Sequence, residues 1–379
     1  MPQNMLGAYG AWAAGLLPAE LPALSFRQER FKSLAGWRSK ARSRVLELLA
    51  QPDLGGPPRV RVDKKHLHEG LHIEELSWQL PSGPRTRAVF LKPAGAKGPL
   101  PGVLALHDHG GNKYFGWRKI ARLPGRTHPL LGPHRQLLYG GAAWATELAR
   151  QGYAVLAHDT FLFGSRRIRY QEVPQVLHGG RKERNPESPR EIAEYNQWAG
   201  AQETVVAKSL FCAGTTWPGV FLSEDQRALD YLCGRPDVDP DRVGCGGLSG
   251  GGLRTVFLAG LDQRIQAAVC AGFMSTWRDF LLHKSYTHTW MAYVPLLPRD
   301  LDFPEILGLR APLPTLVLNT WQDTLYTPPE MKKADRILAA VYAKAKAADH
   351  YTCSFYEGGH KFDLPMQAEA FAFWNRWLK

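Results

Sequence analysis

The chain has 379 residues, of which 44% are hydrophobic, 22% charged and 11% aromatic. This composition is ordinary for a globular enzyme and excludes the disordered and fibrous classes. The formal net charge of +12 suggests a nucleic-acid hypothesis, but much of the excess lies in two local clusters without a recognisable nucleic-acid-binding motif. We therefore expect solvated basic faces and no nucleic-acid partner.

The cysteines and the hydropathy of the sequence indicate in which cellular compartment the protein is expected. The five cysteines are scattered without close pairs, which predicts reduced thiols and no disulfide framework. The sequence has no run of eighteen apolar residues, so neither a membrane span nor a membrane partner is expected. Residues 1–18 have an apolar middle but no preceding basic residue, which argues against a secretory signal. The simplest expectation is a cytoplasmic protein, with homo-oligomer formation left open.

An amphipathic helix is predicted near the start of the chain, from Phe31 to Leu49. Its large apolar residues recur at steps of three and four, so its basic residues point outward. Ser25 precedes Gln28 by three residues and is a candidate for the capping box of this helix. We expect the helix to pack as an extension on the main domain.

Strand signals begin at about residue 71, where we place the boundary between an N-terminal helical extension (1–70) and a catalytic domain (71–379). The first two strands flank Pro81-Ser82-Gly83-Pro84, a turn sequence that predicts an antiparallel hairpin. Short apolar runs then alternate with helix-length segments, which predicts an α/β fold with a doubly wound, mostly parallel sheet. The predicted strands are 72–80, 85–92, 102–107, 153–158, 243–247, 265–270, 315–318 and 352–355, and the main predicted helices are 142–150, 223–233, 253–261, 328–348 and 366–378.

The segment 161–222 does not fit this alternation. It contains a polar stretch and an apparent helix over 191–210, and a compact domain rarely carries such a long connection without a purpose. The segment is interpreted either as a surface insertion or as a cap over the active site, and the sequence favours neither.

The strongest chemical signal is Gly247-Leu248-Ser249-Gly250-Gly251, a Gly-x-Ser-x-Gly motif between an apolar strand and a helix. This context is typical of a nucleophile elbow, in which the serine occupies a strained turn and the glycines remove side chains that would clash. The sequence predicts Ser249 as a nucleophile.

A serine nucleophile needs a base, and the base needs an orienting acid. Asp323 and His360 each follow a predicted strand, and they follow Ser249 in the order that this architecture requires. Asp363 is a rival acid, but it lies beyond the histidine and is better explained as a loop or helix-start residue. The rival bases His283 and His288 precede the last strands and are expected to line the pocket or pack structurally.

An oxyanion hole requires two backbone donors. One should be the N–H of Gly250, the residue after the nucleophile. The other is expected in the His109-Gly110-Gly111-Asn112 loop after the strand 102–107. We favour Gly111 for the second donor and leave Gly110 and Asn112 as alternatives one residue away.

Two histidine-rich stretches are candidate metal sites. One is His107-Asp108-His109, which occupies the expected oxyanion position, and the other is His66, His68 and His72 in an edge region without a matching ligand set. Satisfied or surface histidines are the better explanation in both places. No metal site and no cofactor are predicted.

These motifs together resemble the α/β-hydrolase superfamily, in particular dienelactone-hydrolase-like proteins, acetylxylan-esterase-like enzymes and prolyl-oligopeptidase catalytic domains. The resemblance covers the chain from about residue 72 and implies acyl transfer to water through an acyl-enzyme, without a cofactor. Two departures matter: dienelactone hydrolases proper carry cysteine at the position of Ser249, and the short N-terminal region cannot supply a propeller. The matching positions are 109–111, Asp159, Gly164, 225–232, 236–243, the elbow, Asp323 and Gly359-His360.

The sequence therefore predicts a serine-dependent carboxylic-ester hydrolase that acts on a small-molecule ester, with small acyl esters and acetylated carbohydrate favoured as substrates. Trp277, Trp290 and Trp321 are candidate substrate-pocket residues, although ordinary core packing explains such aromatics as often. The alternatives are a serine peptidase or amidase with the same triad, and a non-catalytic relative that acts as a binding protein.

Overall fold

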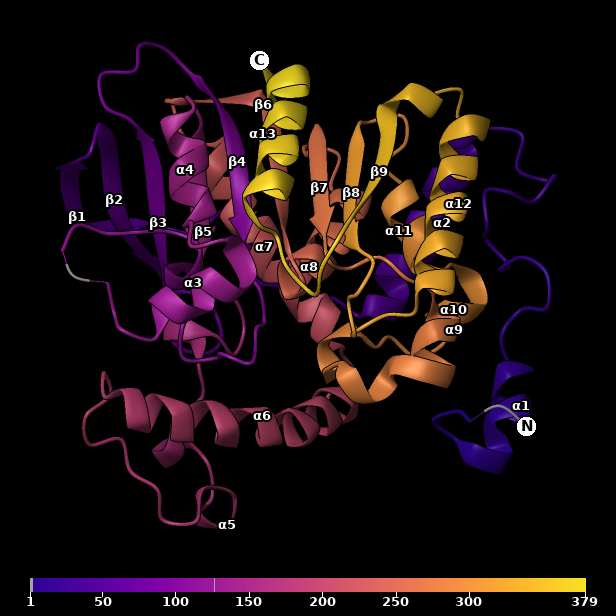
Figure 1. Cartoon of the computed structure of the whole chain (residues 1–379), viewed down its shortest axis with the longest axis horizontal. Coiled ribbons are helices and arrows are strands. Elements are labelled where there is room, and N and C mark those ends of the chain that lie inside the picture. The colour runs from indigo at the N-terminus through magenta and orange to yellow at the C-terminus, as the bar shows by residue number, and fades with distance from the viewer. Residues whose placement is uncertain (1–2, 126) are drawn as a thin grey trace.

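The computed structural model describes residues 3–125 and 127–379, and it is built on a nine-stranded sheet in the order β1-β2-β3-β5-β4-β6-β7-β8-β9 (Figure 1). Strands β4 to β9 are mutually parallel, whereas β1, β2 and β3 pair antiparallel with their neighbours. The predicted hairpin and the mostly parallel sheet are confirmed. The strands are β1 (Arg61–His68), β2 (Leu71–Trp78), β3 (Thr86–Pro93), β4 (Leu100–Leu106), β5 (Ala154–His158), β6 (Val238–Leu248), β7 (Ala267–Ala271), β8 (Thr315–Thr320) and β9 (Tyr351–Tyr356).

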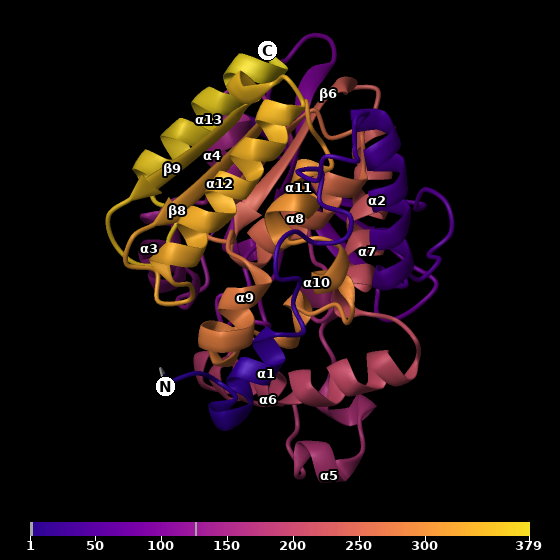
Figure 2. The same ribbon diagram turned by 90° about the vertical axis from the view of Figure 1, so that its right-hand side faces the viewer.

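Helices cover both faces of the sheet, as its nearly continuous apolar strands require. Helices α4 and α13 pack on one face, and α7, α8, α11 and α12 lie on the other (Figure 2). Each layer encloses its own buried apolar cluster. The α-helices are α1 (Gly10–Ala14), α2 (Leu34–Leu49), α3 (Leu131–Tyr139), α4 (Trp144–Arg150), α5 (Gln175–His178), α6 (Pro189–Cys212), α7 (Trp217–Cys233), α8 (Gly250–Leu261), α9 (Trp277–Asp279), α10 (Leu297–Asp300), α11 (Phe303–Gly308), α12 (Pro328–Lys344) and α13 (Leu364–Leu378).

Strand β1 lies within the segment expected to be a helical extension. It pairs antiparallel with β2 at the edge of the sheet, and nearly all of its side chains are exposed. Its sequence, Arg-Val-Asp-Lys-Lys-His-Leu-His, is polar, as expected for an edge strand that must not pair with another molecule. The sheet therefore begins at Arg61, ten residues before the expected boundary, although the division into domains stays a prediction.

The expected N-terminal helix is α2, and it begins three residues later than predicted. Its N-cap is Ser33, whose side chain accepts a hydrogen bond from Gly36 N. The predicted capping role of Ser25 is wrong, because its hydroxyl donates to Glu305 on α11. Arg27, two residues farther along, forms an ion pair with the same buried carboxylate at 3.1 Å. The extension is thus held to the domain by polar contacts as well as by packing.

The long segment 161–222 contains α5, α6 and the start of α7. Figures 1 and 2 both show α6 lying across the end of the sheet where β9 leads into α13, with α5 farther from the sheet. A separate apolar cluster joins α6 to the loop after β4 and includes Phe115, Ile192, Tyr195 and Trp198. This placement is what the cap interpretation expects, while movement of the segment stays a prediction.

Among the described residues, no single helix is both long and apolar enough to cross a membrane. Helices α6 and α7 meet the length and composition criteria only as a pair, and the pair is bent by 87°.

The packing of α2 on α7 depends on a glycine. A Cβ built on Gly219 would lie 2.2 Å from Leu49 O, so Gly219→Ala must push the two helices apart. We expect this substitution to lower the free energy of unfolding by about 1–3 kcal/mol, as overpacking does elsewhere. Urea denaturation measures the change.

The matched control is Gly200→Ala on the exposed face of α6, where a Cβ meets nothing within 4 Å. Since alanine favours the helix over glycine, the control should be neutral or stabilising by about 0.5–1 kcal/mol. Equal effects of the two substitutions would contradict the proposed packing constraint.

Candidate active site

Ser249 is the single residue between β6 and α8, and its backbone is strained. Its φ of 59° and ψ of −115° lie in a region that residues other than glycine rarely adopt. A Cβ on Gly247 would lie 2.1 Å from Leu106 O, and one on Gly251 would lie 2.2 Å from the same oxygen. The glycines therefore let the turn approach β4 closely, which is the strand–turn–helix context of a nucleophile elbow.

Asp323 and His360, predicted from two separate loops, are brought together. Asp323 lies three residues after β8, is 3% exposed, and accepts a hydrogen bond from Leu325 N at 2.9 Å. His360 lies in the loop between β9 and α13, and its Nδ1 is 2.6 Å from Asp323 Oδ2. With Nδ1–H donated to the carboxylate, the neutral ring presents Nε2 as an acceptor.

The end of β7 places this imidazole beside the elbow. Ser249 N donates to Ala271 O at 2.9 Å, and a Cβ on the next residue, Gly272, would lie 3.0 Å from His360 Cε1. Ser249 and His360 therefore contact adjacent residues of one strand end. Among the described residues His360 Nε2 has no hydrogen-bond partner, so it is free to accept a proton.

The rival acid and base have structural roles. Asp363 is the N-cap of α13, where its side chain accepts from Met366 N, as the sequence interpretation expected. His288 packs its ring 4.4 Å from that of Phe280, and its Nδ1 lies 3.2 Å from Lys284 O. Burial lowers the pKa of His288 to about 4, so this side chain is neutral at ordinary pH.

The backbone N–H groups of the loop after β4 differ in what they contact. Gly111 N donates to His109 Nδ1 at 3.0 Å, so this N–H is engaged within its own loop. A Cβ on Gly250 would instead lie 3.0 Å from the backbone nitrogen of His109. The His109 nitrogen therefore lies beside Gly250, whereas the Gly111 N–H already has a partner within the loop.

A buried lysine holds the loop that contains His109. Lys119 is completely buried, and its ammonium donates to the carbonyl oxygens of Asp108, His109 and Asn112. Because Asp108 O and His109 N belong to one peptide group, the ammonium polarises that N–H as well as orienting it. Burial lowers the pKa of Lys119 to about 8 against the opposing effect of Asp108.

Asp108 balances this charge from the other side. Its carboxylate lies 3.2 Å from Lys119 Nζ and 3.2 Å from His134 Nε2, and Tyr139 OH donates to it at 2.5 Å. Although burial opposes ionisation, the charge of Lys119 and these contacts hold the pKa of Asp108 well below its usual range. The His107-Asp108-His109 stretch is therefore a support for the loop.

The three predicted pocket tryptophans differ in their surroundings. Trp277 is 5% exposed, stacks 3.8 Å from the ring of Phe303 and donates to Leu301 O, so its assignment to a substrate pocket is wrong. Trp321 stacks on Phe355 at 4.3 Å, and its pocket role stays a prediction. Trp290 is 37% exposed and donates to Thr204 on α6 at 3.1 Å.

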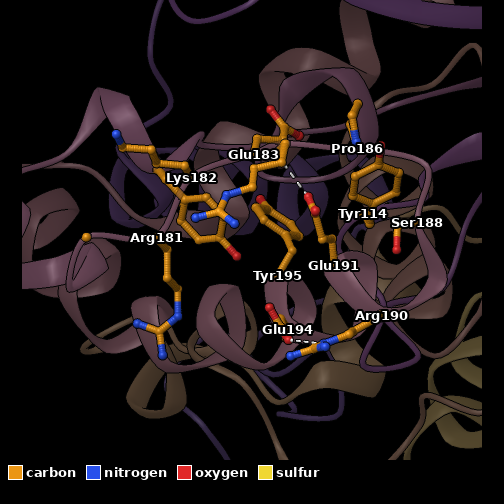
Figure 3. Close-up of a pocket in the computed structure, with 13 residues that line it drawn as sticks. Tyr114, Arg181, Lys182, Glu183, Pro186, Ser188, Arg190, Glu191, Glu194 and Tyr195 are labelled. Carbon is orange, nitrogen blue, oxygen red and sulfur yellow. Dashed lines mark hydrogen bonds and ion pairs between the residues drawn. The ribbon is translucent and has the colours of Figure 1, made fainter.

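A cavity of about 390 Å³ lies in the insertion and is distinct from this site (Figure 3). Tyr114 and Tyr195 line it together with charged residues that pair locally, such as Arg190 with Glu194. Within the described residues, no cluster of three or more histidine, cysteine or carboxylate side chains has an arrangement that could hold a metal ion.

Comparison with known proteins places the chain in a family. No protein-family model matches it. It is 30% identical over 344 residues to the Bacillus subtilis (strain 168) protein named "Putative hydrolase YtaP", covering 90% of this chain and 100% of that protein. The chain belongs to the same family as this protein.

Solved structures agree on the fold. A "putative acetyl xylan esterase" of Bacteroides fragilis NCTC 9343 matches with a TM-score of 0.68 at 18% identity, covering 93% of this chain and 82% of that one. A glucuronoyl esterase from Solibacter usitatus matches with a TM-score of 0.63 at 17% identity, covering 95% and 99%. The predicted α/β-hydrolase fold is confirmed.

Sequence reasoning missed Lys119 and Glu203, a residue of α6 whose carboxylate lies 2.8 Å from His109 Nε2. The sequence carried no local signal for either, because a lone lysine in a loop or glutamate in a helix is ordinary. Only the expectation that segment 161–222 has a purpose pointed toward Glu203.

The strain at the elbow predicts a stability change. Glycine adopts the Ser249 backbone conformation without steric cost, whereas alanine, which has a Cβ, keeps the steric cost that serine has. We expect the free energy of unfolding, measured by urea denaturation, to be higher for Ser249→Gly than for Ser249→Ala. The relief of strain contributes about 1–3 kcal/mol, and the greater freedom of glycine in the unfolded chain offsets a few tenths of a kcal/mol of it. Equal stability of the two variants would show that the turn is unstrained.

Proposed function

We propose that the protein is a serine-dependent carboxylic-ester hydrolase with Ser249 as nucleophile, His360 as base and Asp323 as orienting acid. The observation that carries the proposal is the 2.6 Å contact between Asp323 and His360, which leaves His360 Nε2 without a partner among the described residues and beside a strained serine turn. A buried acid, an oriented imidazole and a half-buried turn serine are the parts that covalent acyl transfer needs.

The mechanism follows from these positions. Ser249 Oγ attacks the ester carbonyl while His360 Nε2 takes its proton, and the Asp323 carboxylate stabilises the imidazolium that forms. The backbone N–H groups of Gly250 and His109 hold the oxyanion. His360 then protonates the leaving alcohol and activates a water molecule, which hydrolyses the acyl-enzyme.

Small acyl esters, including acetylated carbohydrate, are the proposed substrates. Two structural relatives carry the names acetyl xylan esterase and glucuronoyl esterase, which supports a carbohydrate ester as the class to test first. Trp290 is the aromatic that fits a role in substrate binding, since its ring is partly exposed next to α6. Aromatic faces of this kind bind the apolar surface of a sugar.

The proposal predicts ester hydrolysis that depends on all three residues. Turnover of p-nitrophenyl acetate and of an acetylated xylo-oligosaccharide should fall by about 10⁴–10⁶ in Ser249→Ala and by about 10⁴ in Asp323→Asn, because removal of one member disables the unit. The measurement is steady-state kinetics on folded variants, with Asp363→Asn as the control carboxylate outside the triad.

An active Ser249→Ala variant would contradict the proposal. Comparison of a matched ester and amide of the same acyl group separates the esterase from a peptidase or amidase, which would cleave the amide in preference. Turnover confined to long-chain or bulky aryl esters would refute the small-acyl preference alone.

A further inference from the structure

Helix α6 contacts the loop after β4 (residues 107–116), here called the oxyanion loop, at two points on one face of the helix. Asn196 accepts a hydrogen bond from Tyr114 N at 2.9 Å, and its amide donates to Asn112 Oδ1 at 3.1 Å. Glu203 lies seven residues farther along, which is about two helical turns, so it projects from the same face. The insertion is therefore attached to the loop that carries the second oxyanion donor.

Glu203 makes the stronger of these contacts. It is 6% exposed, and its Oε1 lies 2.8 Å from His109 Nε2 and 2.7 Å from Lys113 Nζ. Lys113 is 2% exposed, with its ammonium 4.4 Å from the centre of the Phe163 ring. Burial opposes ionisation of Glu203, but the contacts with His109 and Lys113 lower its pKa, so it is a carboxylate at neutral pH.

The hydrogen bonds of His109 fix its tautomer. Its Nδ1 accepts the Gly111 N–H at 3.0 Å, so the ring proton is on Nε2 and is donated to Glu203. Burial lowers the pKa of His109, which keeps the ring neutral. An edge contact with Phe163, 5.5 Å between ring centres, fixes the ring plane. Both nitrogens and the ring plane are thus held.

Fixing this side chain also fixes the backbone to which it is attached. The His109 nitrogen lies 3.0 Å from a Cβ built on Gly250, while the following two residues, Gly110 and Gly111, have positive φ angles of 53° and 64°. Two consecutive glycines give the loop little conformational preference of its own. The orientation of the His109 N–H therefore depends on contacts, those of Lys119 with the Asp108 carbonyl oxygen and of Glu203 with the His109 side chain.

We propose that the insertion helix α6 is part of the catalytic machinery, with Glu203 as a positioning residue that orients the His109 backbone N–H toward the oxyanion through the His109 side chain. This inference rests on the proposed esterase function and deepens it. A positioning role in the oxyanion hole affects the transition state and leaves ground-state binding of the ester unchanged.

The experiment compares Glu203→Ala and Glu203→Gln with wild type on p-nitrophenyl acetate, with kcat expressed per Ser249 site titrated by a fluorophosphonate. We expect Glu203→Ala to lower kcat by about 10–100-fold at nearly unchanged KM. This decrease is somewhat smaller than the decrease in kcat that follows removal of a whole oxyanion donor. Glu203→Gln keeps an acceptor for the His109 proton but loses the charge, so its loss should be smaller.

A second measurement separates positioning from general damage. A trifluoromethyl ketone forms a tetrahedral adduct with an oxyanion, so its affinity should fall by the same factor as kcat, while inhibition by the product acetate should not change. The matched control is Glu194→Ala on the same helix, whose side chain is 52% exposed and pairs with Arg190. It should retain wild-type kcat.

Two results would overturn the inference and leave the esterase function standing. One is a wild-type kcat per titrated site in Glu203→Gln and in any folded Glu203→Ala. The other is a loss confined to KM or to thermal stability. If Glu203→Ala does not fold, a wild-type kcat and ketone affinity in Glu203→Gln would overturn it alone. Absence of Ser249-dependent hydrolysis in the wild type would instead overturn the proposed function and this inference with it.

Discussion

The close backbone contact between the end of β4 and the turn after β6 is the constraint on which the rest of the site depends. Leu106 O leaves no space for a Cβ on Gly247 or Gly251, so the turn lies directly against the neighbouring strand. The same turn brings Gly250 next to the His109 nitrogen and contains Ser249 in its strained conformation. Since side chains are excluded there, the elbow turn can approach β4 closely, and side-chain contacts from Lys119 and Glu203 act on the neighbouring loop.

Charged groups then stabilise the loop that follows β4, at an electrostatic cost. Lys119 and Asp108 are both fully buried, and taking such charges out of water is unfavourable unless each is paired and hydrogen bonded. Here the ammonium has three carbonyl acceptors in addition to the carboxylate. The arrangement gives a glycine-rich loop a defined conformation, and Glu203 supplies a similar contact from α6.

The sequence predicted those parts of the site that depend on local backbone requirements. The elbow was recognisable because only glycines permit the turn, and Asp323 and His360 were recognisable because each follows a parallel strand in the required order. All eight predicted strands are present, since each is an apolar run or part of a hairpin with a clear turn. Strand β1 could not be predicted, because an exposed edge strand lacks the apolar pattern.

The remaining parts depend on contacts between distant residues. The proposed choice of His109 over Gly111 as donor rests on a side-chain hydrogen bond within the loop and on Glu203, 94 residues away in the chain. The place of Trp277 after a strand predicts a pocket residue, yet its ring packs against Phe303 in the core. An aromatic residue near a strand end has the same sequence signature in either environment.

Labelling with a fluorophosphonate tests the central claim most directly, because the probe reacts only with a serine whose base and oxyanion donors are assembled. The modified peptide is mapped by mass spectrometry, with Ser249→Ala as the control. We expect one phosphonyl group per chain, carried by Ser249 and absent from the variant. A folded protein that is not labelled, or labelling that persists in Ser249→Ala, would contradict it.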